Sequence, residues 1–282
     1  MYKTGLVLEG GAVRGIFSAG VVDYLMEQEL EFPYVIGVSA GSGVAVNYCT
    51  HQIGRSKKVI GHEGQRPYFG FKQFFHSGKF LNLDDLVYEY SLKTFPYDFD
   101  AFFRGKYHCE SVAIECESGE CRYFEEYPDS DYVLKVNKAS CSVPFVSKPV
   151  EIDGKHYLDG SLKDSIPVAH AMEKGCEKLV VVLTRPAGGK PTDYSKMKLY
   201  IKMKYRKYPN LVKAMLARKE NYYEQAATLE KLVQEGKAFV MRPEGAAISH
   251  FEKKPERIEW YYREGYNTAK KHMEELREFL NR

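Results

Sequence analysis

The sequence contains no long uninterrupted apolar segment and no closely paired cysteines. A helix that crosses a membrane needs about 20 consecutive apolar residues, and no stretch of the 282 residues approaches that length. The apolar run near the N-terminus ends at Glu9, which is too early for the hydrophobic region of a secretory signal peptide. The six cysteines show no C-x-x-C spacing, so we expect reduced thiols and no metal site. These absences favour a cytoplasmic protein without a metal or other cofactor.

The composition of the chain is sufficient to form a large hydrophobic core. Hydrophobic residues make up 44% of the chain, and the formal net charge is +3. Apolar runs at 4–8 and 178–183 have the composition of buried strands. The segments 107–114 and 121–124 have the pattern of two paired strands. Because these strands alternate with helical patterns, we expect an α/β fold with a mostly parallel central sheet.

A G-x-S-x-G pattern places Ser39 between Gly37 and Gly41. It follows the apolar run 34–36 and precedes a helical stretch, which is the setting of a nucleophile elbow. The glycines matter because a Cβ on either side would collide with the neighbouring strand and helix. Such a turn sets the serine hydroxyl at a helix N-terminus, which favours negative charge. The alternative is an ordinary glycine-rich turn with a capping serine.

A second glycine-containing loop joins the first predicted strand to a long amphipathic helical pattern. The tandem glycines within Glu9–Gly15 leave backbone N–H groups free to converge on an anion. A dinucleotide-binding loop would need glycine at the position of Ala12, so we favour an oxyanion hole. The N–H groups that would form it belong to Gly10, Gly11 and Ala12. Arg14 would add positive potential there, or would be a solvated residue of the first helical turn.

A predicted hairpin far along the chain ends at Asp159. Residues 150–158 have a strand pattern interrupted by an Asp-Gly turn, and Asp159-Gly160-Ser161 follows directly. An Asp-Gly pair alone indicates a turn and nothing more. With Ser39 and the glycine loop in the same chain, a carboxylate at the end of a strand becomes a candidate general base.

Together these motifs resemble the patatin-like phospholipase family. The resemblance runs from the glycine loop at residues 10–15 through the Ser39 turn to Asp159-Gly160 and Pro167. The stretch Ala139–Phe145, shortly before the hairpin, is also similar to that family. The agreement of three motifs in the same order argues against a chance match. The resemblance implies a three-layer α/β/α fold.

The sequence departs from the family pattern at two places within residues 4–185. Ser161 stands where the family usually has glycine or alanine, and Asp164-Ser165 replaces an asparagine that commonly precedes the proline. Neither change touches the atoms of acyl transfer. These departures therefore bear on the subfamily and the substrate rather than on the type of reaction.

The resemblance implies hydrolysis of lipid carboxyl esters, of the phospholipase A or lysophospholipase type, by a Ser–Asp dyad without histidine. In such a dyad Ser39 attacks the ester carbonyl, Asp159 accepts its proton, and a water molecule then releases the acid. Desolvation beside the serine is expected to raise the pKa of Asp159 above the usual value of about 3.9. The residues that would support the dyad are Arg14, Gly37, Gly41 and Gly160.

Two alternatives stay open at this point. A Ser-His-Asp esterase of the α/β-hydrolase type would need a histidine after Asp159, and His170, His250 and His272 are available. That fold normally places several strands before its serine, whereas Ser39 leaves room for one strand and one helix. The other alternative is a lipid-binding protein that retains the serine turn without catalysis.

The Gly188-Gly189 break divides the expected catalytic core, 1–187, from a basic and mostly helical region, 188–282, packed on that core. Residues 190–219 contain ten Lys or Arg and one acid, interleaved with Tyr, Met and Leu. This mixture suits contact with an anionic membrane, and an ordinary solvated helix pair explains it about as well. No motif that reads bases accompanies the charge, so we expect no nucleic acid.

Two further segments carry expectations about packing. The segment 68–75 is rich in aromatic residues and is expected to join the core, to wall a cavity for an acyl chain or to form a lid. The segment 255–280 has the pattern of one long amphipathic helix on the outer face of the domain.

Overall fold

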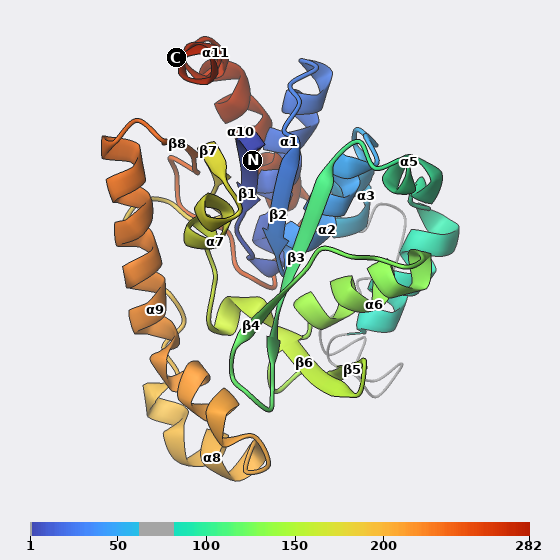
Figure 1. The fold of residues 1–282 in the computed structure, drawn as a ribbon, viewed down its shortest axis with the longest axis vertical. Coiled ribbons are helices and arrows are strands. Elements are labelled where there is room, and N and C mark those ends of the chain that lie inside the picture. Colours follow the sequence, from blue (N-terminus) through green and yellow to red (C-terminus); the bar gives the residue numbers. More distant parts are fainter. Residues whose placement is uncertain (1, 62–81) are drawn as a thin grey trace.

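The computed structural model describes residues 2–61 and 82–282 (Figure 1). Within these residues the chain forms an eight-stranded mixed sheet with helices on both faces. The three-layer α/β/α architecture expected from the sequence is confirmed. The aromatic segment 68–75, considered above as part of a cavity wall, lies outside the described residues. None of the described helices is both long and apolar enough to cross a membrane.

The centre and one side of the sheet are parallel. The strands on this side, in spatial order, are β3 (His108–Glu115), β2 (Tyr34–Val38), β1 (Tyr2–Leu8), β7 (Cys176–Val182) and β8 (Ala238–Met241). β1, β2 and β7 are almost entirely buried, because helices cover both of their faces. The apolar runs that predicted these strands are therefore confirmed.

The opposite edge of the sheet is antiparallel. It consists of β4 (Cys121–Phe124), β5 (Val150–Ile152) and β6 (Lys155–Asp159). β4 and β6 both pair with β3, and β5 pairs with β6. Asp153 and Gly154 form the turn of the β5–β6 hairpin, both with positive φ. The hairpin predicted from residues 150–158 is confirmed, and it delivers Asp159 beside the centre of the sheet.

Helices cover the two faces of the sheet. One face carries α1 (Gly15–Glu27), α2 (Ala40–Cys49), α3 (Arg55–Ile60), α6 (Ser130–Ser140), α10 (Pro255–Lys271) and α11 (Met273–Asn281). The other face carries α7 (Val168–Glu173) and α9 (Pro209–Gln234). The remaining short elements are η1 (Ala12–Arg14), η2 (Asp85–Thr94), α5 (Phe99–Phe103), η3 (Gly160–Leu162), η4 (Ser195–Met197) and α8 (Lys198–Lys204).

The alternation of side chains along each strand separates two cores. Leu6 and Leu8 of β1 face α1 and α2, whereas Val7 between them faces α7 and α9. A third cluster joins Ile201 of α8 and Leu211 of α9 to the antiparallel edge of the sheet. Helices therefore cover both faces of the sheet, and their apolar side chains pack on those of the strands.

The region after residue 187 enters the sheet as well as covering it. β8 pairs in parallel with β7, so a segment expected to be mostly helical also supplies a strand. The single helix predicted for 255–280 is wrong, because the structure contains two helices, α10 and α11. At His272 between them the backbone leaves the helical conformation, with φ −99° and ψ 14°. The change of direction brings Phe279 of α11 against Phe239 of β8.

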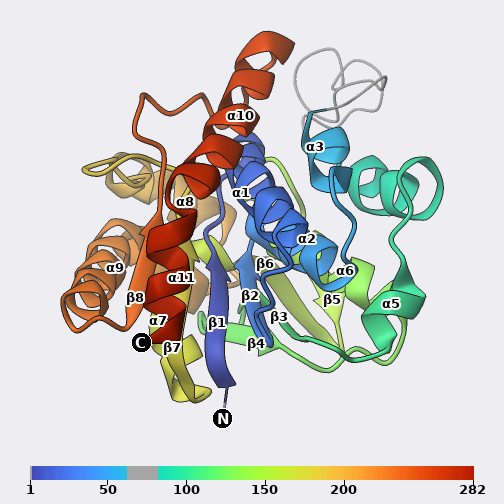
Figure 2. The same ribbon diagram turned by 90° about the horizontal axis from the view of Figure 1, so that it is seen from above.

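Helix α10 lies against α1 (Figure 2), and a glycine of each helix is at the contact. A Cβ on Gly20 of α1 would lie 2.1 Å from the carbonyl oxygen of Tyr262. A Cβ on Gly265 of α10 would lie 2.1 Å from the carbonyl oxygen of Phe17. Both distances are far shorter than a van der Waals contact, so the two backbones approach as closely as the chain permits.

Substitution of either glycine is expected to destabilise the fold. Gly265→Ala and Gly20→Ala should each lower the free energy of unfolding by about 2 kcal/mol or more, because α10 must move away from α1. Gly245→Ala is the matched control, since its Cβ would meet its nearest atoms at 3.6 Å; it should change stability by less than about 0.5 kcal/mol. Urea denaturation followed by circular dichroism measures all three. Equal stability of Gly265→Ala and Gly245→Ala would contradict this packing.

Candidate active site

Ser39 occupies a strained turn between β2 and α2. Its backbone has φ 55° and ψ −126°, a conformation that residues with a side chain rarely adopt. The turn is held by close contacts of its two glycines, as the sequence predicted. A Cβ on Gly37 would lie 2.2 Å from the carbonyl oxygen of Gly41, and a Cβ on Gly41 would lie 2.4 Å from that of Leu8. The G-x-S-x-G segment therefore has the geometry of a nucleophile elbow.

The structure brings Asp159 to Ser39 from the antiparallel edge of the sheet. The Ser39 hydroxyl donates a hydrogen bond of 2.7 Å to Oδ2 of Asp159, and both side chains are buried. Oδ1 of Asp159 accepts a hydrogen bond of 2.9 Å from the backbone N–H of Ser161. A Cβ on Gly160 would lie 2.6 Å from the carbonyl oxygen of Val112, so this glycine lets the strand end approach β3.

Burial raises the pKa of Asp159 above its usual value. Hydrogen bonds from Ser39 and Ser161, together with the positive charge of Arg218, act in the opposite direction. The balance gives a stronger base than a solvated carboxylate, because a higher pKa increases its affinity for the serine proton. Its two hydrogen bonds also hold the carboxylate in one orientation toward Ser39.

Ser140 fixes the serine turn from a third segment. The backbone N–H of Ser39 donates a hydrogen bond of 2.8 Å to Oγ of Ser140. The Ser140 hydroxyl in turn donates one of 2.7 Å to the carbonyl oxygen of Val112. Ser140 belongs to the stretch 139–145, which the resemblance singled out without assigning a role to its residues.

The glycine loop after β1 lies directly against Ser39. A Cβ on Gly10 would lie 2.8 Å from Cβ of Ser39, and one on Gly11 would lie 2.6 Å from Oγ1 of Thr184. Ala12 has a positive φ of 50°. Within the described parts of the chain, the N–H groups of Gly10 and Gly11 donate no hydrogen bond. Backbone donors beside a serine hydroxyl are therefore available to a ligand.

Arg14 is buried behind this loop, so it is not the solvated helix residue considered as an alternative. Its guanidinium is hydrogen-bonded to Nε2 of His250. Desolvation and the charges of Arg14, Arg185 and Arg218 lower the pKa of His250 to about 3. His250 is therefore neutral near pH 7 and can accept a hydrogen bond from Arg14.

Each of the three histidines that could complete a catalytic triad has a partner other than the dyad. His170 is paired with Glu110 and stacked on Tyr123, and His272 is paired with Glu275. His250 contacts Arg14, as described above. Among the described residues, none of the three forms a hydrogen bond with Ser39 or Asp159. The carboxylate meets the serine directly, without an intervening imidazole.

Four residues that the sequence did not single out for the site complete its surroundings. They are Glu9, Arg185, Arg218 and Tyr222. The buried carboxylate of Glu9 pairs with Arg185 at 3.2 Å and accepts a hydrogen bond of 3.1 Å from the Tyr222 hydroxyl. Arg218 donates one of 2.9 Å to the carbonyl oxygen of Ser161, next to Asp159. Arg218 and Tyr222 belong to α9, and no local pattern relates that helix to Ser39.

Two cavities of different character meet at Ser39. One is mostly apolar and is lined by side chains of α2, α3 and η2, among them Val44, Val59, Ile60 and Val87, and by Leu83 just before η2. The other is more polar and is lined by Asp159, Ser161, Thr192, Tyr194, Arg185 and Arg218. Ala12, Ser39, Val143, His250 and Phe251 line both cavities. A bound molecule at Ser39 could therefore place an apolar part on one side and a polar part on the other.

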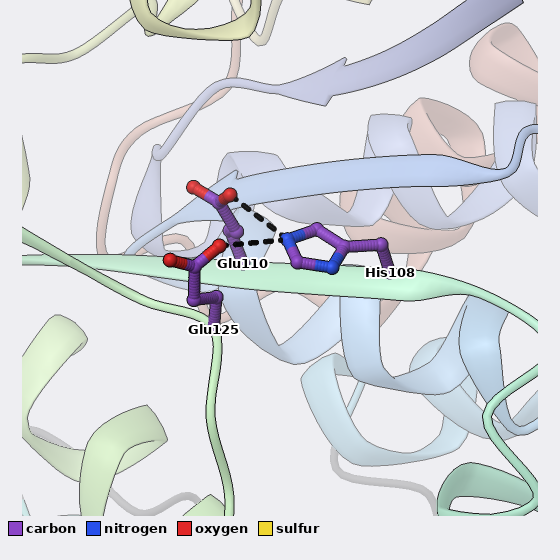
Figure 3. Close-up of side chains that lie close together, drawn as sticks. All are labelled: His108, Glu110 and Glu125. Atoms are coloured by element: carbon purple, nitrogen blue, oxygen red, sulfur yellow. Dashed lines mark hydrogen bonds and ion pairs between the residues drawn. The ribbon is translucent and has the colours of Figure 1, made fainter. Parts of the chain in front are cut away.

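A separate cluster of ionisable groups lies on β3 (Figure 3). Nε2 of His108 lies 3.0 Å from Glu110 and 3.1 Å from Glu125, and these three residues could hold a metal ion. Lys174 already balances the carboxylates, at 2.5 Å from Glu125 and 3.4 Å from Glu110. Burial alone would raise the pKa of Glu110, but His108, His170 and Lys174 lower it to about 2. The cluster thus ties α7 to β3, and its residues line neither cavity at Ser39.

Two family models match parts of this sequence. The sequence model of patatin-like phospholipases matches residues 6–172. A second model, for a domain of unknown function called DUF6363, matches residues 208–281. The chain therefore belongs to the patatin-like phospholipase family.

Individual proteins match parts of this chain with modest sequence identity. An uncharacterized Escherichia coli K12 protein, YjjU, is 33% identical over 190 residues, which are 66% of this chain and 53% of that protein. Lysophospholipases of Emericella nidulans and Saccharomyces cerevisiae are 28% and 27% identical over 63% of this chain, but these matches cover 12% and 10% of those proteins. The chain thus spans about half of the bacterial relative and a small part of the fungal ones.

The fold also resembles a solved structure. VipD from Legionella pneumophila matches over 99% of this chain and 67% of its own, with a TM-score of 0.51 at 12% identity. At this identity the likeness concerns the fold alone.

Proposed function

We propose that this protein is a serine acyl hydrolase that cleaves carboxyl esters of phospholipids or lysophospholipids with the dyad Ser39 and Asp159. The observation that carries the proposal is the 2.7 Å hydrogen bond from the Ser39 hydroxyl to Asp159 at the meeting point of two cavities. The apolar cavity suits a fatty acyl chain, because its lining is mostly apolar and includes Ser39.

In the proposed mechanism Oγ of Ser39 attacks the ester carbonyl carbon while its proton passes to Oδ2 of Asp159. The carbonyl oxygen becomes negative and accepts hydrogen bonds from backbone N–H groups of the glycine loop, formed by Gly10, Gly11 and Ala12. Asp159 then gives the proton to the leaving alcohol oxygen, which leaves an acyl ester on Ser39. Water repeats the sequence with Asp159 as the base and releases the fatty acid.

The two alternatives drawn from the sequence receive less support. A triad requires a histidine between serine and carboxylate, and His250 instead accepts a hydrogen bond from Arg14. A binding protein without catalysis has no need of a strained backbone at Ser39 or of a buried base beside it. The strained backbone and the buried carboxylate both lower the stability of the folded protein, and catalysis gives a reason to retain them.

We further propose that the basic segment 190–219 docks on an anionic membrane. On α8 the side chains of Leu199 and Met203 are 84% and 67% exposed, which is unusual for large apolar residues. Exposed cations surround them, at Lys196, Lys198, Lys202, Lys204, Arg206 and Lys207. Tyr200 stacks on Phe145, which lines the polar cavity, so the docking face adjoins the mouth of the site. α8 lies at one end of the molecule, where it can approach a flat surface (Figure 1).

The dyad predicts a specific order of mutational effects. Ser39→Ala and Asp159→Asn should each lower kcat/KM for a lysophospholipid by about 10³-fold or more, and the double variant should lose little further activity, because the two residues act as one unit. His250→Asn should retain activity within about tenfold, and thermal melting should show that all variants fold. A loss in His250→Asn equal to that in Ser39→Ala would replace the dyad with a triad.

The pH dependence of the reaction should report Asp159. The base must be ionised, so kcat/KM should rise with pH through the pKa of Asp159, which burial places above its usual value, and should then remain level. His250, with a pKa of about 3, stays neutral from pH 5 to 9 in an assay and adds no step there. Rates measured over that range should give the same profile in His250→Asn. A step that disappears in this variant would show that the histidine titrates in catalysis.

Charge reversal in and just after α8 should separate membrane docking from chemistry. Lys202→Glu combined with Arg206→Glu and Lys207→Glu should weaken sedimentation with phosphatidylglycerol vesicles, since each basic residue near an anionic surface contributes about 1 kcal/mol. Hydrolysis of a short water-soluble ester should be retained. The control reverses three other exposed lysines, Lys231 near the C-terminal end of α9, Lys237 before β8 and Lys270 on α10. Vesicle binding that is insensitive to salt and equal in both triple variants would exclude the docking surface.

A further inference from the structure

The surroundings of the dyad contain more buried positive than negative charge. Arg14, Arg185 and Arg218 are 7%, 5% and 8% exposed, and all three act electrostatically on His250. The buried carboxylates that face them are Glu9 and Asp159, at 1% and 4% exposed. Three guanidinium groups thus face two carboxylates, and protonation of Asp159 during the reaction would increase the imbalance. Buried charge is costly unless it is paired, so this arrangement favours an anionic ligand.

Arg218 has a donor that the protein leaves unused. Its Nε donates to the carbonyl oxygen of Ser161 at 2.9 Å, and its Nη2 lies 3.4 Å from the Ser161 hydroxyl. Its third nitrogen, Nη1, is buried and has no hydrogen-bond partner among the described residues. Arg218 lines the polar cavity together with Arg185, whose guanidinium is anchored by Glu9 and stacked on Tyr222. Ser161 therefore holds the Arg218 side chain in place, and Nη1 of Arg218 is available to a ligand.

The position of the two cavities restricts what the anion can be, and this step rests on the proposed function. With the acyl chain in the apolar cavity and the ester carbonyl at Ser39, the leaving alcohol points into the polar cavity. The leaving alcohol of a lysophospholipid carries a phosphate, whereas that of a neutral acylglycerol carries hydroxyl groups alone. Guanidinium groups match phosphate oxygens in geometry and charge.

We infer that Arg218, assisted by Arg185, binds the phosphate of the glycerophospho leaving group, so that the enzyme prefers lysophospholipids to neutral acylglycerols. Arg218 lies on α9, within the part of the chain that matches the domain of unknown function. That region thus supplies a specificity-determining residue to the catalytic core. His250, which is hydrogen-bonded to Arg14, comes from the same region and is neutral near pH 7.

Ligand binding to an inactive protein tests the phosphate subsite without turnover. Ser39→Ala protein should bind sn-glycerol 3-phosphate in calorimetry and should not bind glycerol at the same concentrations. Adding Arg218→Met should weaken this binding at least tenfold. Adding Lys231→Met instead, which removes an exposed charge from the same helix, should leave it unchanged. No binding to Ser39→Ala, or equal binding to all three proteins, would overturn the inference.

Kinetics distinguish a headgroup site from a site for free phosphate or a positioning role. For a lysophospholipid and a monoacylglycerol with the same acyl chain, Arg218→Met should lower the ratio of kcat/KM values at least tenfold, chiefly through a higher KM for the lysophospholipid. Arg218→Lys should retain part of the preference and guards against a folding defect in the methionine variant. A fall in kcat that is equal for both lipids would assign Arg218 to positioning the Asp159 turn and overturn the inference. Inorganic phosphate binding that depends on Arg218, with an unchanged lipid preference, would overturn it as well. Absence of turnover of either lipid by the unmodified protein would instead refute the proposed function.

Discussion

The turn that carries Ser39 depends on backbone segments that approach too closely for side chains to lie between them. Leu8 at the end of β1 contacts Gly41, and Val112 of β3 contacts Gly160 beside Asp159. These contacts bring the ends of three strands, β1, β2 and β6, to one place in the sheet. The 2.7 Å hydrogen bond between Ser39 and Asp159 follows from this convergence. Bulkier residues at the contact positions would separate the strand ends, and Ser39 would lose its hydrogen bond to Asp159.

The C-terminal region is part of this arrangement. β8 extends the sheet, α10 approaches α1 through paired glycines, and α9 brings Arg218 and Tyr222 to the site. Glu9, one residue before the glycine loop, is held by Tyr222 and Arg185. The loop that would stabilise an oxyanion is thereby tied to a helix that begins about 200 residues later in the chain. The geometry around Ser39 and the packing of the C-terminal region on the core are therefore physically coupled.

The predictions from sequence succeeded where a local pattern implies a local structure. The strands, the hairpin before Asp159 and the strained turn at Ser39 all depend on residues that are neighbours in the chain. Arg218 was counted among the basic residues of 190–219, because nothing nearby shows that its side chain is buried against Ser161. The break at His272 was also missed, since the apolar periodicity continues across it from α10 into α11. Contacts between distant segments decide such details, and periodicity does not report them.

Reaction with a fluorophosphonate probe tests the central claim most directly, because the probe reacts with serines activated by a neighbouring base. The folded protein should be labelled once, and mass spectrometry should locate the adduct on the peptide that contains Ser39. Heat-unfolded protein should remain unlabelled, since the activation depends on the strained turn and on the hydrogen bond to Asp159. Labelling of a different serine, or no labelling of a protein that is shown to be folded, would contradict the dyad.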